Sequence, residues 1–277
     1  RGKKSLALDL RKDGAKEVIY SLSKKSDVFV SNLRQSALDK WELDYLNLTN
    51  HNPQIIYSIG YGYGPLGPDR NLPAFDHTAQ TRGGLLSVIG EADMSPPPWG
   101  VPWLADTVGG MQVVMAIMFA LFTRERTGIG QQVNTSLLGG QLAIGAPLLN
   151  SFLFSGEEPR KMKRTEAYNP LRSSYQAKDG KWFCLNMTTG DRYWPGFCQA
   201  LDMEHLTNDV RFNSNPKRSE NNKQLISMLD DIFSTKTRSA WMQILSKHGL
   251  ACGPVQSYAE VAADPQVLYN EYISTID

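Results

Sequence analysis

The residue best placed for chemistry in this sequence is Asp106. It stands alone where an extended apolar approach, residues 99–105, turns into a long apolar helix that we expect to begin near Thr107. The free N–H groups at a helix start stabilise an anion by about 0.3 to 1 kcal/mol, which favours an ionised carboxylate at neutral pH. An ionised carboxylate can act as a nucleophile. Position alone leaves a second interpretation open, in which Asp106 only caps the helix.

The helix after Asp106 is predicted from apolar residues that recur at helical spacing: Val108, Met111, Val114, Met115, Met118, Phe119 and Phe122. Because most of the residues between them are also apolar, we expect this helix to be mostly buried. It should end at residues 124–128, where cations are followed by Gly128. Gly109 and Gly110 near its start each cost roughly 1 kcal/mol relative to alanine, which indicates that something approaches the backbone closely.

Two segments around this helix resemble a known family. Residues 100–110, GVPWLADTVGG, and residues 124–133, RERTGIGQQV, are similar to the signature of the class III CoA-transferases, the family of formyl-CoA transferase and crotonobetainyl-CoA:carnitine CoA-transferase. Further family blocks occur in the family's order at residues 5–10, 27–34, 52–57, 74–76 and 249–255. The resemblance therefore covers nearly the whole chain, and Asp106 matches the family's catalytic aspartate.

The resemblance implies a specific reaction, in which CoA moves from an acyl-CoA donor to a carboxylic acid acceptor. Asp106 would attack the donor thioester and release CoA thiolate, which returns to the aspartyl anhydride. The acceptor carboxylate would then attack the resulting aspartyl-CoA thioester. The oxyanions formed need hydrogen-bond donors, and the candidates are free N–H groups near Asp106 or in the loop at 60–67. Coenzyme A, as acyl-CoA substrate, is the cofactor implied, with no metal, nicotinamide or flavin.

A CoA site needs cations for phosphate and an apolar slot for adenine. Arg11 and Lys40 match positions that contact CoA in the family, and Arg34 belongs to an Asn-Leu-Arg block that resembles a family block. The remaining matching positions would line the slot: Leu8, Asn32, Leu33, Trp41, Leu72 and Phe75.

Two rival functions stay open. The acyl-CoA racemase branch of the same family uses a histidine just before an aspartate, but the corresponding block here is Ala74-Phe75-Asp76, and phenylalanine cannot transfer a proton. His77 is displaced by one position and would point elsewhere on a helix. The second rival is a non-catalytic CoA-binding subunit, against which the presence of Asp106 argues.

One literal motif match fails in its context. Residues 62–67, GYGPLG, satisfy the dinucleotide fingerprint after a predicted strand. Pro65, Pro68 and Pro73 prevent a helix from starting at these glycines, and no acid lies close to 20 residues further on. We therefore interpret the segment as a conformationally permissive loop beside the site.

Composition excludes several classes of function. The net charge of the 277 residues is +1 and there is no basic run, so nucleic acid is not an expected partner. The 3 cysteines and 4 histidines are scattered and fit neither a disulfide framework nor a zinc site. The apolar run at 111–122 is shorter than the roughly 20 residues that a membrane span requires. With no signal peptide recognised, we expect a cytoplasmic protein.

Strand-like and helix-like segments alternate through the first half of the chain. This order implies parallel strands joined by right-handed crossovers, in an open Rossmann-like α/β sheet. The expected strands are 6–10, 28–30, 55–59 and 132–135, and the expected helices, beside the one after Asp106, are 14–25, 36–48, 74–89 and 137–154.

A second, smaller α+β domain is expected further along. Charge and polarity rise through 156–164, so we place a large CoA-binding domain at 1–155 and a linker at 156–173. The small domain is expected at 174–262, and the start of a returning linker at 263–277. Asp179-Gly180 between two strand-like runs predicts a hairpin. Helices should follow at 193–201, 219–233 and 239–247.

The family resemblance also predicts how the chain assembles. Class III transferases resemble two linked rings, in which each large domain is completed by both ends of its chain. We therefore expect an interlocked homodimer. The resemblance begins at a point normally well inside the first domain and stops before the returning segment, so we expect that the N-terminal part and the returning segment are missing.

Overall fold

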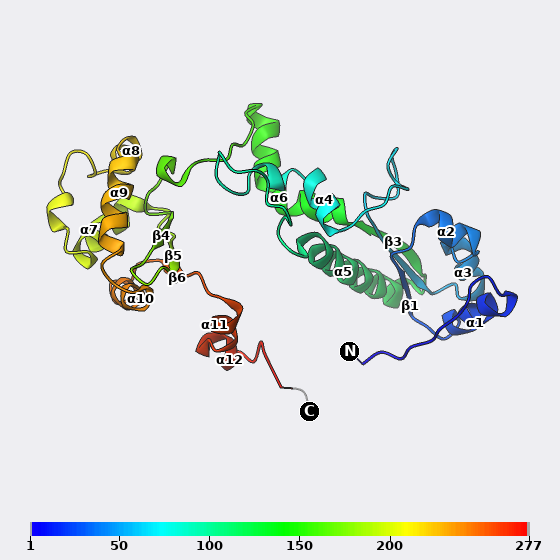
Figure 1. The fold of residues 1–277 in the computed structure, drawn as a ribbon. Coiled ribbons are helices and arrows are strands. Elements are labelled where there is room, and N and C mark those ends of the chain that lie inside the picture. The colour runs from blue at the N-terminus through cyan, green and yellow to red at the C-terminus, as the bar shows by residue number, and fades with distance from the viewer. Residues whose placement is uncertain (1, 276–277) are drawn as a thin grey trace. The chain divides into compact units, whose positions relative to one another are not determined.

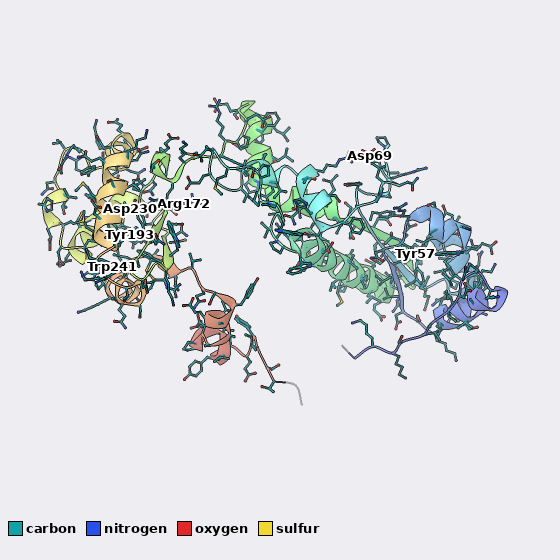
Figure 2. The ribbon with its side chains drawn as sticks, in the orientation of Figure 1. Tyr57, Asp69, Arg172, Tyr193, Asp230 and Trp241 are labelled. Atoms are coloured by element: carbon teal, nitrogen blue, oxygen red, sulfur yellow. The ribbon has the colours of Figure 1, made fainter. Side chains whose placement is uncertain are left out.

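The computed structural model describes residues 2–275. The chain divides into two compact units, Arg1–Lys161 and Met162–Asp277 (Figure 1). Each unit has its own sheet and its own helices. Tyr57, in the first unit, and Trp241, in the second, belong to the two sets of core residues (Figure 2).

The sheet of the first unit is parallel, which confirms the α/β interpretation of the sequence. Its described strands are β1 (Val28–Ser31), β2 (Ile56–Tyr61) and β3 (Gln131–Ser136), in that spatial order. Ile56 of β2 pairs with Val28 and Gln131, and Tyr61 pairs with Ser136. Because the three strands run the same way, their carboxyl ends meet at one edge of the sheet.

One face of this sheet is covered by short helices. α1 (Asp13–Ser23), α2 (Gln35–Lys40) and α3 (Tyr45–His51) contribute to a core with β2 that contains Tyr20, Leu38, Leu43, Leu48, Tyr57, Ile59 and Tyr61. The single helix expected at 36–48 is in fact two helices. Glu42 between them has a φ of 55°, a left-handed conformation that ends α2, and Asp44 then caps α3 by accepting the N–H of Asn47 at 3.1 Å.

The other face of the sheet carries the long helices. α4 (Asp76–Arg82) and a 3-10 turn, η1 (Leu85–Ser87), replace the helix expected at 74–89. They are followed by α5 (Leu104–Thr127) and, after β3, by α6 (Leu137–Ser155). α5 contacts β2, β3, α4 and α6.

The expectation that α5 is mostly buried is wrong for this chain. The residues that α5 buries are small: Ala105, Gly109 and Ala120. The large apolar side chains point away from the sheet and are more than half exposed: Met111, Val114, Met115, Met118, Phe119 and Phe122. Small residues let the helix approach the strands closely, so the bulky ones are left on the outer face.

The strand expected at 6–10 is absent from the described structure. Residues 2–9 have no regular secondary structure, and none of them pairs with β1. A strand exists only through its ladder of hydrogen bonds, so the Leu6–Leu10 pattern is insufficient without a neighbour.

The apolar run at 111–122 lies within a helix that is longer than the run itself. α5 has 24 residues and α6 has 19, and both are apolar enough to span a bilayer. Both helices nevertheless pack within the α/β unit, α5 against β2 and β3 and α6 against α5. In the described residues, 17% of the apolar window of α5 and 11% of that of α6 is buried, and length and composition alone are weak evidence for a membrane span.

The second unit is an α+β arrangement. β4 (Ser174–Gln176) and β5 (Trp182–Leu185) form the hairpin predicted from Asp179-Gly180, and β6 (Cys252–Pro254) pairs with β5. The sheet is antiparallel. Its helices are α7 (Gly190–Ala200), α8 (Asn215–Glu220), α9 (Asn222–Phe233), α10 (Arg238–Lys247), α11 (Tyr258–Ala262) and α12 (Pro265–Tyr269), with 3-10 turns η2 (Arg164–Glu166) and η3 (Glu204–Leu206).

An aromatic core holds the second unit together. Phe233 of α9 makes edge contacts with Phe183 of β5 and Trp241 of α10, at ring-centroid distances of 4.9 and 5.2 Å. Trp241 Nε1 donates to the Phe233 carbonyl at 2.9 Å, so its polar atom is satisfied inside the core. At the edge of the unit, Arg164 forms a bidentate pair with Asp230, which Figure 2 labels.

Candidate active site

Asp106 lies in the first turn of α5 and does not cap it. The helix begins at Leu104, and the residue that precedes it, Trp103, has a left-handed φ of 56°. Within residues 2–275, the Asp106 carboxylate accepts no hydrogen bond. The interpretation of Asp106 as a simple cap is therefore wrong, and its carboxylate is not engaged in capping the helix.

The cap of α5 is supplied by another helix. Asp76, the first residue of α4, accepts the backbone N–H groups of Ala105 and Asp106 on its Oδ1 atom, at 2.8 and 3.1 Å. The next amide, that of Thr107, donates to the Trp103 carbonyl at 2.9 Å. The amides of Ala105, Asp106 and Thr107 are thus occupied, and the expectation that such groups near Asp106 stabilise an oxyanion is wrong for these three.

Asp76 is itself held in place by Gln80, one turn later on α4. Gln80 Nε2 donates to Asp76 Oδ2 at 2.8 Å and to the Val101 carbonyl at 2.7 Å. Gln80 Oε1 accepts the Val101 N–H at 2.9 Å. The Gln80 side chain is fully buried, so this network ties α4 to the segment that leads into α5.

The electrostatic environment of Asp106 differs from the one that its helix position predicted. Partial burial raises the pKa of the Asp106 carboxyl, and the nearby Asp76 carboxylate raises it further. The helix N-terminus was expected to favour the ionised form, but its first donors are bonded to Asp76. Desolvation and a like charge both disfavour ionisation and make the carboxylate that does form more basic.

A cavity of about 620 Å³ opens beside Asp106. Its lining comes from the carboxyl ends of the three parallel strands and from the start of α5, as is typical of ligand sites in open α/β sheets. The lining residues are Asn32, Leu33, Gly60, Tyr61, Gly62, Ala74, Phe75, Asp106, Gly109, Gly110, Val113, Thr135, Ser136 and Leu137.

The two glycines at the start of α5 have different roles. A Cβ at Gly109 would lie 2.8 Å from Leu137 Cδ2, so this glycine permits close packing against the start of α6. A Cβ at Gly110 would meet nothing within 4 Å. Gly110 lies one turn after Asp106 on the same side of the helix, and it leaves the cavity open there.

Five of the predicted CoA-binding residues gather around this cavity. Asn32, Leu33 and Phe75 line it directly. Arg34 and Leu72 line an adjoining hollow of about 130 Å³, and the two spaces have seven lining residues in common. The structure thus brings these five residues together with Asp106.

Three other predicted residues lie at a separate hollow of about 150 Å³. Arg11, Lys40 and Trp41 line it together with Leu10, Lys12, Lys16, Glu42 and Leu43. The hollow is rich in cations, although Arg11 pairs with Asp9 at 2.8 Å and Lys16 pairs with Glu42. Leu8 is half-buried in the irregular N-terminal segment and lines neither hollow.

Several lining residues were missed by the sequence analysis. Val113, Thr135, Ser136 and Leu137 face the cavity, but none of them was singled out. The signal was available, because the carboxyl ends of neighbouring parallel strands lie together and β3 ends at Ser136.

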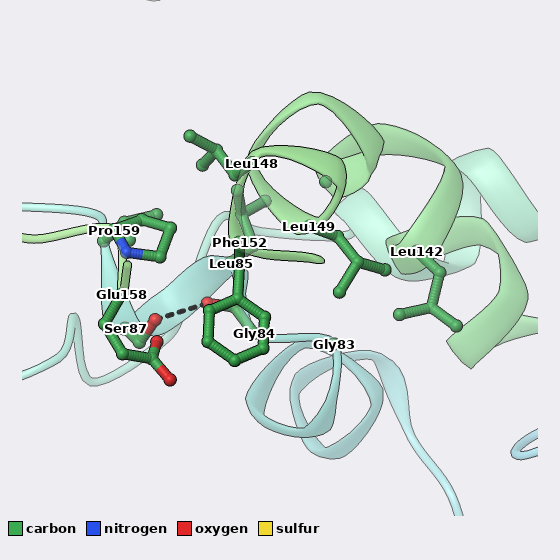
Figure 3. A pocket seen from close by; sticks show the side chains of 12 residues that line it. Gly83, Gly84, Leu85, Ser87, Leu142, Leu148, Leu149, Phe152, Glu158 and Pro159 are labelled. Atoms are coloured by element: carbon green, nitrogen blue, oxygen red, sulfur yellow. Dashed lines mark hydrogen bonds between the residues drawn. The ribbon is translucent and has the colours of Figure 1, made fainter. Parts of the chain in front are cut away.

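A further hollow of about 130 Å³ lies between η1 and α6 (Figure 3). Its walls are mostly apolar, and Glu158 is its one charged lining residue. Ser87 in its wall donates to the Gly84 carbonyl at 2.7 Å, which satisfies the hydroxyl locally. The hollow does not include Asp106 or any predicted CoA-binding residue.

Two features bear on alternative chemistries. Phe75 faces the Asp106 cavity, whereas His77 does not line it and lies beside Gly100, where a Cβ would be 3.2 Å from His77 Cδ2. No helix starts at the glycines of residues 62–67, because the next helix begins at Asp76. Among the residues that the structure describes, no cluster of three or more His, Cys, Asp and Glu side chains could hold a metal ion.

Comparison with known proteins places the whole sequence in one family. The family model described as CoA-transferase family III matches residues 1–277. Acetyl-CoA:oxalate CoA-transferase of Acetobacter aceti is 30% identical over 268 residues, covering 96% of this chain and 68% of that protein. Human succinyl-CoA:glutarate CoA-transferase is 27% identical over 277 residues, covering 100% and 63%.

A solved structure agrees with the sequence comparisons. A CAIB/BAIF family protein from Brucella suis superimposes with a TM-score of 0.86 at 31% identity, covering 98% of this chain and 71% of that one. An acyl-CoA transferase of Fusarium pseudograminearum is 32% identical over 274 residues, covering 99% of this chain and 59% of that protein. The chain thus spans about two thirds of the length of the relatives that it matches.

Proposed function

The chain belongs to CoA-transferase family III, and we propose that it moves CoA from an acyl-CoA donor to a carboxylic acid acceptor. The observation that carries this proposal is the Asp106 carboxylate, which has no hydrogen-bond donor within residues 2–275 and faces a cavity at the carboxyl ends of three parallel strands. The relatives named above support the reaction class, since their names describe transfer of CoA between acids.

The proposed reaction begins with attack of an Asp106 carboxylate oxygen on the thioester carbonyl of the donor. The C–S bond breaks, CoA leaves as thiolate, and Asp106 becomes part of a mixed anhydride. The thiolate then attacks Cγ of Asp106 and releases the donor acid as a carboxylate, which leaves an aspartyl-CoA thioester. Nucleophilic catalysis of this kind divides one difficult exchange into easier steps.

The second half of the proposed reaction repeats these steps with the acceptor. The acceptor carboxylate attacks Cγ of Asp106, the C–S bond breaks, and a second anhydride forms. CoA thiolate attacks the acceptor carbonyl and restores the Asp106 carboxylate. Every step exchanges one carboxylate or thiolate for another, so the sequence needs no oxidant, metal or net proton transfer.

The oxyanions of these steps need donors, and the loop at 60–67 is the remaining candidate. The amides of Ala105, Asp106 and Thr107 are already bonded. Gly62, which directly follows β2, lines the cavity that contains Asp106, so N–H groups of this loop can approach a substrate carbonyl there. Donors that are in place before reaction stabilise a developing oxyanion at no cost of reorganisation.

The proposed CoA site uses two regions of the first unit. The cation-rich hollow at Arg11, Lys40 and Trp41 suits the phosphates and the adenine. Asn32 and Leu33 line both the Asp106 cavity and its adjoining hollow, and would border the arm that carries the thioester. Arg34, Leu72 and Phe75 complete this part, and Leu8 is assigned by resemblance alone.

Racemisation and a non-catalytic role are less well supported. A racemase needs a second acid or base at the substrate, but Phe75 occupies that position and His77 lies outside the cavity lining. A non-catalytic subunit would have no use for an unbonded carboxylate in a substrate-sized cavity. Incubation with an acyl-CoA and a free acid distinguishes the three, through CoA exchange, inversion at the α-carbon or neither.

We also propose an interlocked homodimer in the cytoplasm, with the large domain, linker and small domain bounded as the sequence analysis expects. The exposed outer face of α5 supports an assembled state, because six large apolar side chains there are at least 58% exposed. Contiguous apolar surface of this kind marks an interaction site.

Replacement of the nucleophile tests the proposed function. Asp106→Ala should abolish CoA transfer, while circular dichroism and calorimetric CoA binding stay as in the wild type. The matched control is Glu125→Ala, which removes an exposed carboxylate near the other end of α5. Wild-type turnover in Asp106→Ala would refute the mechanism.

The covalent intermediate gives an independent test. Hydroxylamine or borohydride added during turnover should modify Asp106, and peptide mapping should find the label on that residue. Asp76 is the control carboxylate, because it is bonded to the start of α5. Labelling of Asp76 instead would show that the wrong nucleophile was assigned.

A further inference from the structure

Asp76 has no role in the proposed reaction, but it contacts the backbone of Asp106 directly. Its Oδ1 atom accepts the amides of Ala105 and Asp106, and its Oδ2 atom accepts from Gln80. Every one of these partners is a donor. Asp76 thus forms an unusual cap, because the carboxylate at the start of α5 comes from α4 and not from the residue that precedes the helix.

We propose that Asp76, held by Gln80, is the positioning residue of this site: it fixes the first turn of α5 and keeps the helix amides bonded, so that the Asp106 carboxylate stays over the cavity without donors. This inference rests on the proposed function for its catalytic consequence. It goes further by assigning a role to a second carboxylate and to a buried glutamine.

The positioning role follows from the hydrogen-bond geometry. Gln80 holds the Val101 amide and carbonyl at 2.9 and 2.7 Å, which fixes the chain before α5, while Asp76 fixes the first amides of the helix. A Cβ at Gly100 would lie 2.6 Å from Gln80 Oε1, so the backbone here has no room to move toward the glutamine. Both ends of the turn that presents Asp106 are therefore held by α4.

The chemical role follows from what the amides would otherwise do. N–H groups at a helix start stabilise a carboxylate within reach and lower its basicity. Because Asp76 engages the amides of Ala105 and Asp106, Asp106 receives no hydrogen bond from them. The Asp76 charge also lies near Asp106 and raises the pKa of that carboxyl, after the larger effect of partial burial.

No other charged group lines the cavity in the described residues and could explain the raised pKa of Asp106. Within the described residues, Tyr61 of β2 is the other titratable group that lines the cavity, and burial raises the pKa of its hydroxyl. The lining residues from β3 and α6 are Thr135, Ser136 and Leu137, which carry no charge. Asp76 of α4 is therefore the charged group that acts on Asp106.

Two variants test the charge of Asp76 and the positioning by Gln80. Asp76→Asn keeps an oxygen for the two amides, removes the charge and replaces the acceptor of the Gln80 bond with a donor, so the pKa of Asp106 should fall and the acid limb of kcat/KM should move to lower pH. Gln80→Met keeps the side-chain volume but removes the bonds to Asp76 and Val101. If the loss of these bonds displaces the Asp106 carboxylate by about 1 Å, kcat should fall on the order of 10²-fold.

The matched control for Asp76→Asn is Asp44→Asn. Asp44 also caps a helix through its side chain, accepting the Asn47 N–H at 3.1 Å at the start of α3, a different helix from the one that carries Asp106. This variant should leave the pH profile and the Asp106 titration unchanged. An equal shift of the Asp106 pKa in Asp76→Asn and Asp44→Asn would overturn the proposal, because loss of any capping carboxylate would then have the same effect.

A direct titration keeps this inference independent of the proposed function. Carbon-13 NMR of labelled aspartate gives the pKa of Asp106, with Asp106→Asn used to assign its signal. A lower pKa in Asp76→Asn supports the inference even in a protein without CoA-transfer activity, which would refute only the proposed function. An unchanged Asp106 titration in Asp76→Asn, or unchanged kcat in folded Gln80→Met, would overturn the inference.

Discussion

Gly62 and Ala74 lie so close together that a Cβ on Gly62 would be 2.2 Å from the Cβ of Ala74. Gly62 directly follows β2, and Ala74 leads into α4, so this contact joins the glycine-rich loop to the segment that carries Phe75 and Asp76. Both residues line the Asp106 cavity. The glycine thus serves close packing of two backbones.

Gly62→Ala should therefore destabilise the protein. Neither Cβ can rotate away, so residues 74–76 must shift, and overpacking of this kind costs typically about 1 to 3 kcal/mol. Denaturant unfolding measures the free energy. The control is Gly60→Ala, two residues earlier in β2, where the nearest atom to the new Cβ is 3.6 Å away in ordinary contact. Equal stability of the two variants would contradict the close approach.

Gly110 should give the opposite result, because its missing Cβ points into open space. Gly110→Ala removes a helix-interior glycine and should stabilise the protein by about 0.5 to 1 kcal/mol. The methyl group also enters the cavity one turn from Asp106, so KM should rise for acyl groups that fill this space. Thermal unfolding and a series of acyl-CoA donors of increasing size measure the two effects.

The neighbouring glycine is the control for that experiment. At Gly109 a new Cβ would lie 2.8 Å from Leu137 Cδ2, so Gly109→Ala gains the same helix propensity but forces the Leu137 side chain to shift. It should show no gain in stability. A similar gain at both positions would mean that the contact with Leu137 does not constrain α5.

The sequence predicted the identity of the central residue better than its surroundings. Asp106 could be predicted as the nucleophile for two reasons. It is a lone carboxylate at the start of an apolar helix, and it lies in the block at residues 100–110 that resembles the family. Its partner Asp76 is 30 residues away, and no local pattern predicts that a carboxylate from one helix caps another. The direction of the Asp106 pKa shift was missed because it depends on partial burial first and on the Asp76 charge second, and neither is visible in the local sequence.

The errors in the fold have a similar cause. α5 is apolar on both sides, so periodicity cannot tell which face packs on the sheet, and the small residues Ala105, Gly109 and Ala120 decided it. The strand expected at Leu6–Leu10 depends on a neighbouring strand that local sequence cannot supply. The hairpin at Asp179-Gly180 was predictable because its turn chemistry is local, and Gly180 has the required positive φ of 73°.

The second unit should show a pH-dependent stability that arises from Glu260. Lys181, the Ser257 amide and Arg238 bond this carboxylate and lower its pKa from 4.5 to about 2. A lowered pKa in the folded state contributes stability that is present above pH 4.5 and is lost as pH falls toward 2. Glu260→Gln should therefore lose stability relative to the wild type at neutral pH, with a smaller difference near pH 3.

Denaturant unfolding at several pH values measures this difference. Glu220→Gln is the control, because Glu220 forms an exposed pair with Lys217 on the same unit and such pairs contribute little. A difference between wild type and Glu260→Gln that stays constant from neutral pH down to pH 3 would refute the assignment to this carboxylate.

The protein should be a homodimer whose subunits separate only on unfolding. The family resemblance implies that the two chains thread each other, and the apolar outer face of α5, from Met111 to Phe122, is a surface that a lone chain leaves in water. Stability is then inseparable from dimerisation. Sedimentation at nanomolar concentration should show a dimer, and tagged and untagged dimers mixed in native buffer should not exchange subunits. Subunit exchange should appear when the tagged and untagged proteins are denatured, mixed and refolded. A folded, active monomer would exclude the interlocked arrangement.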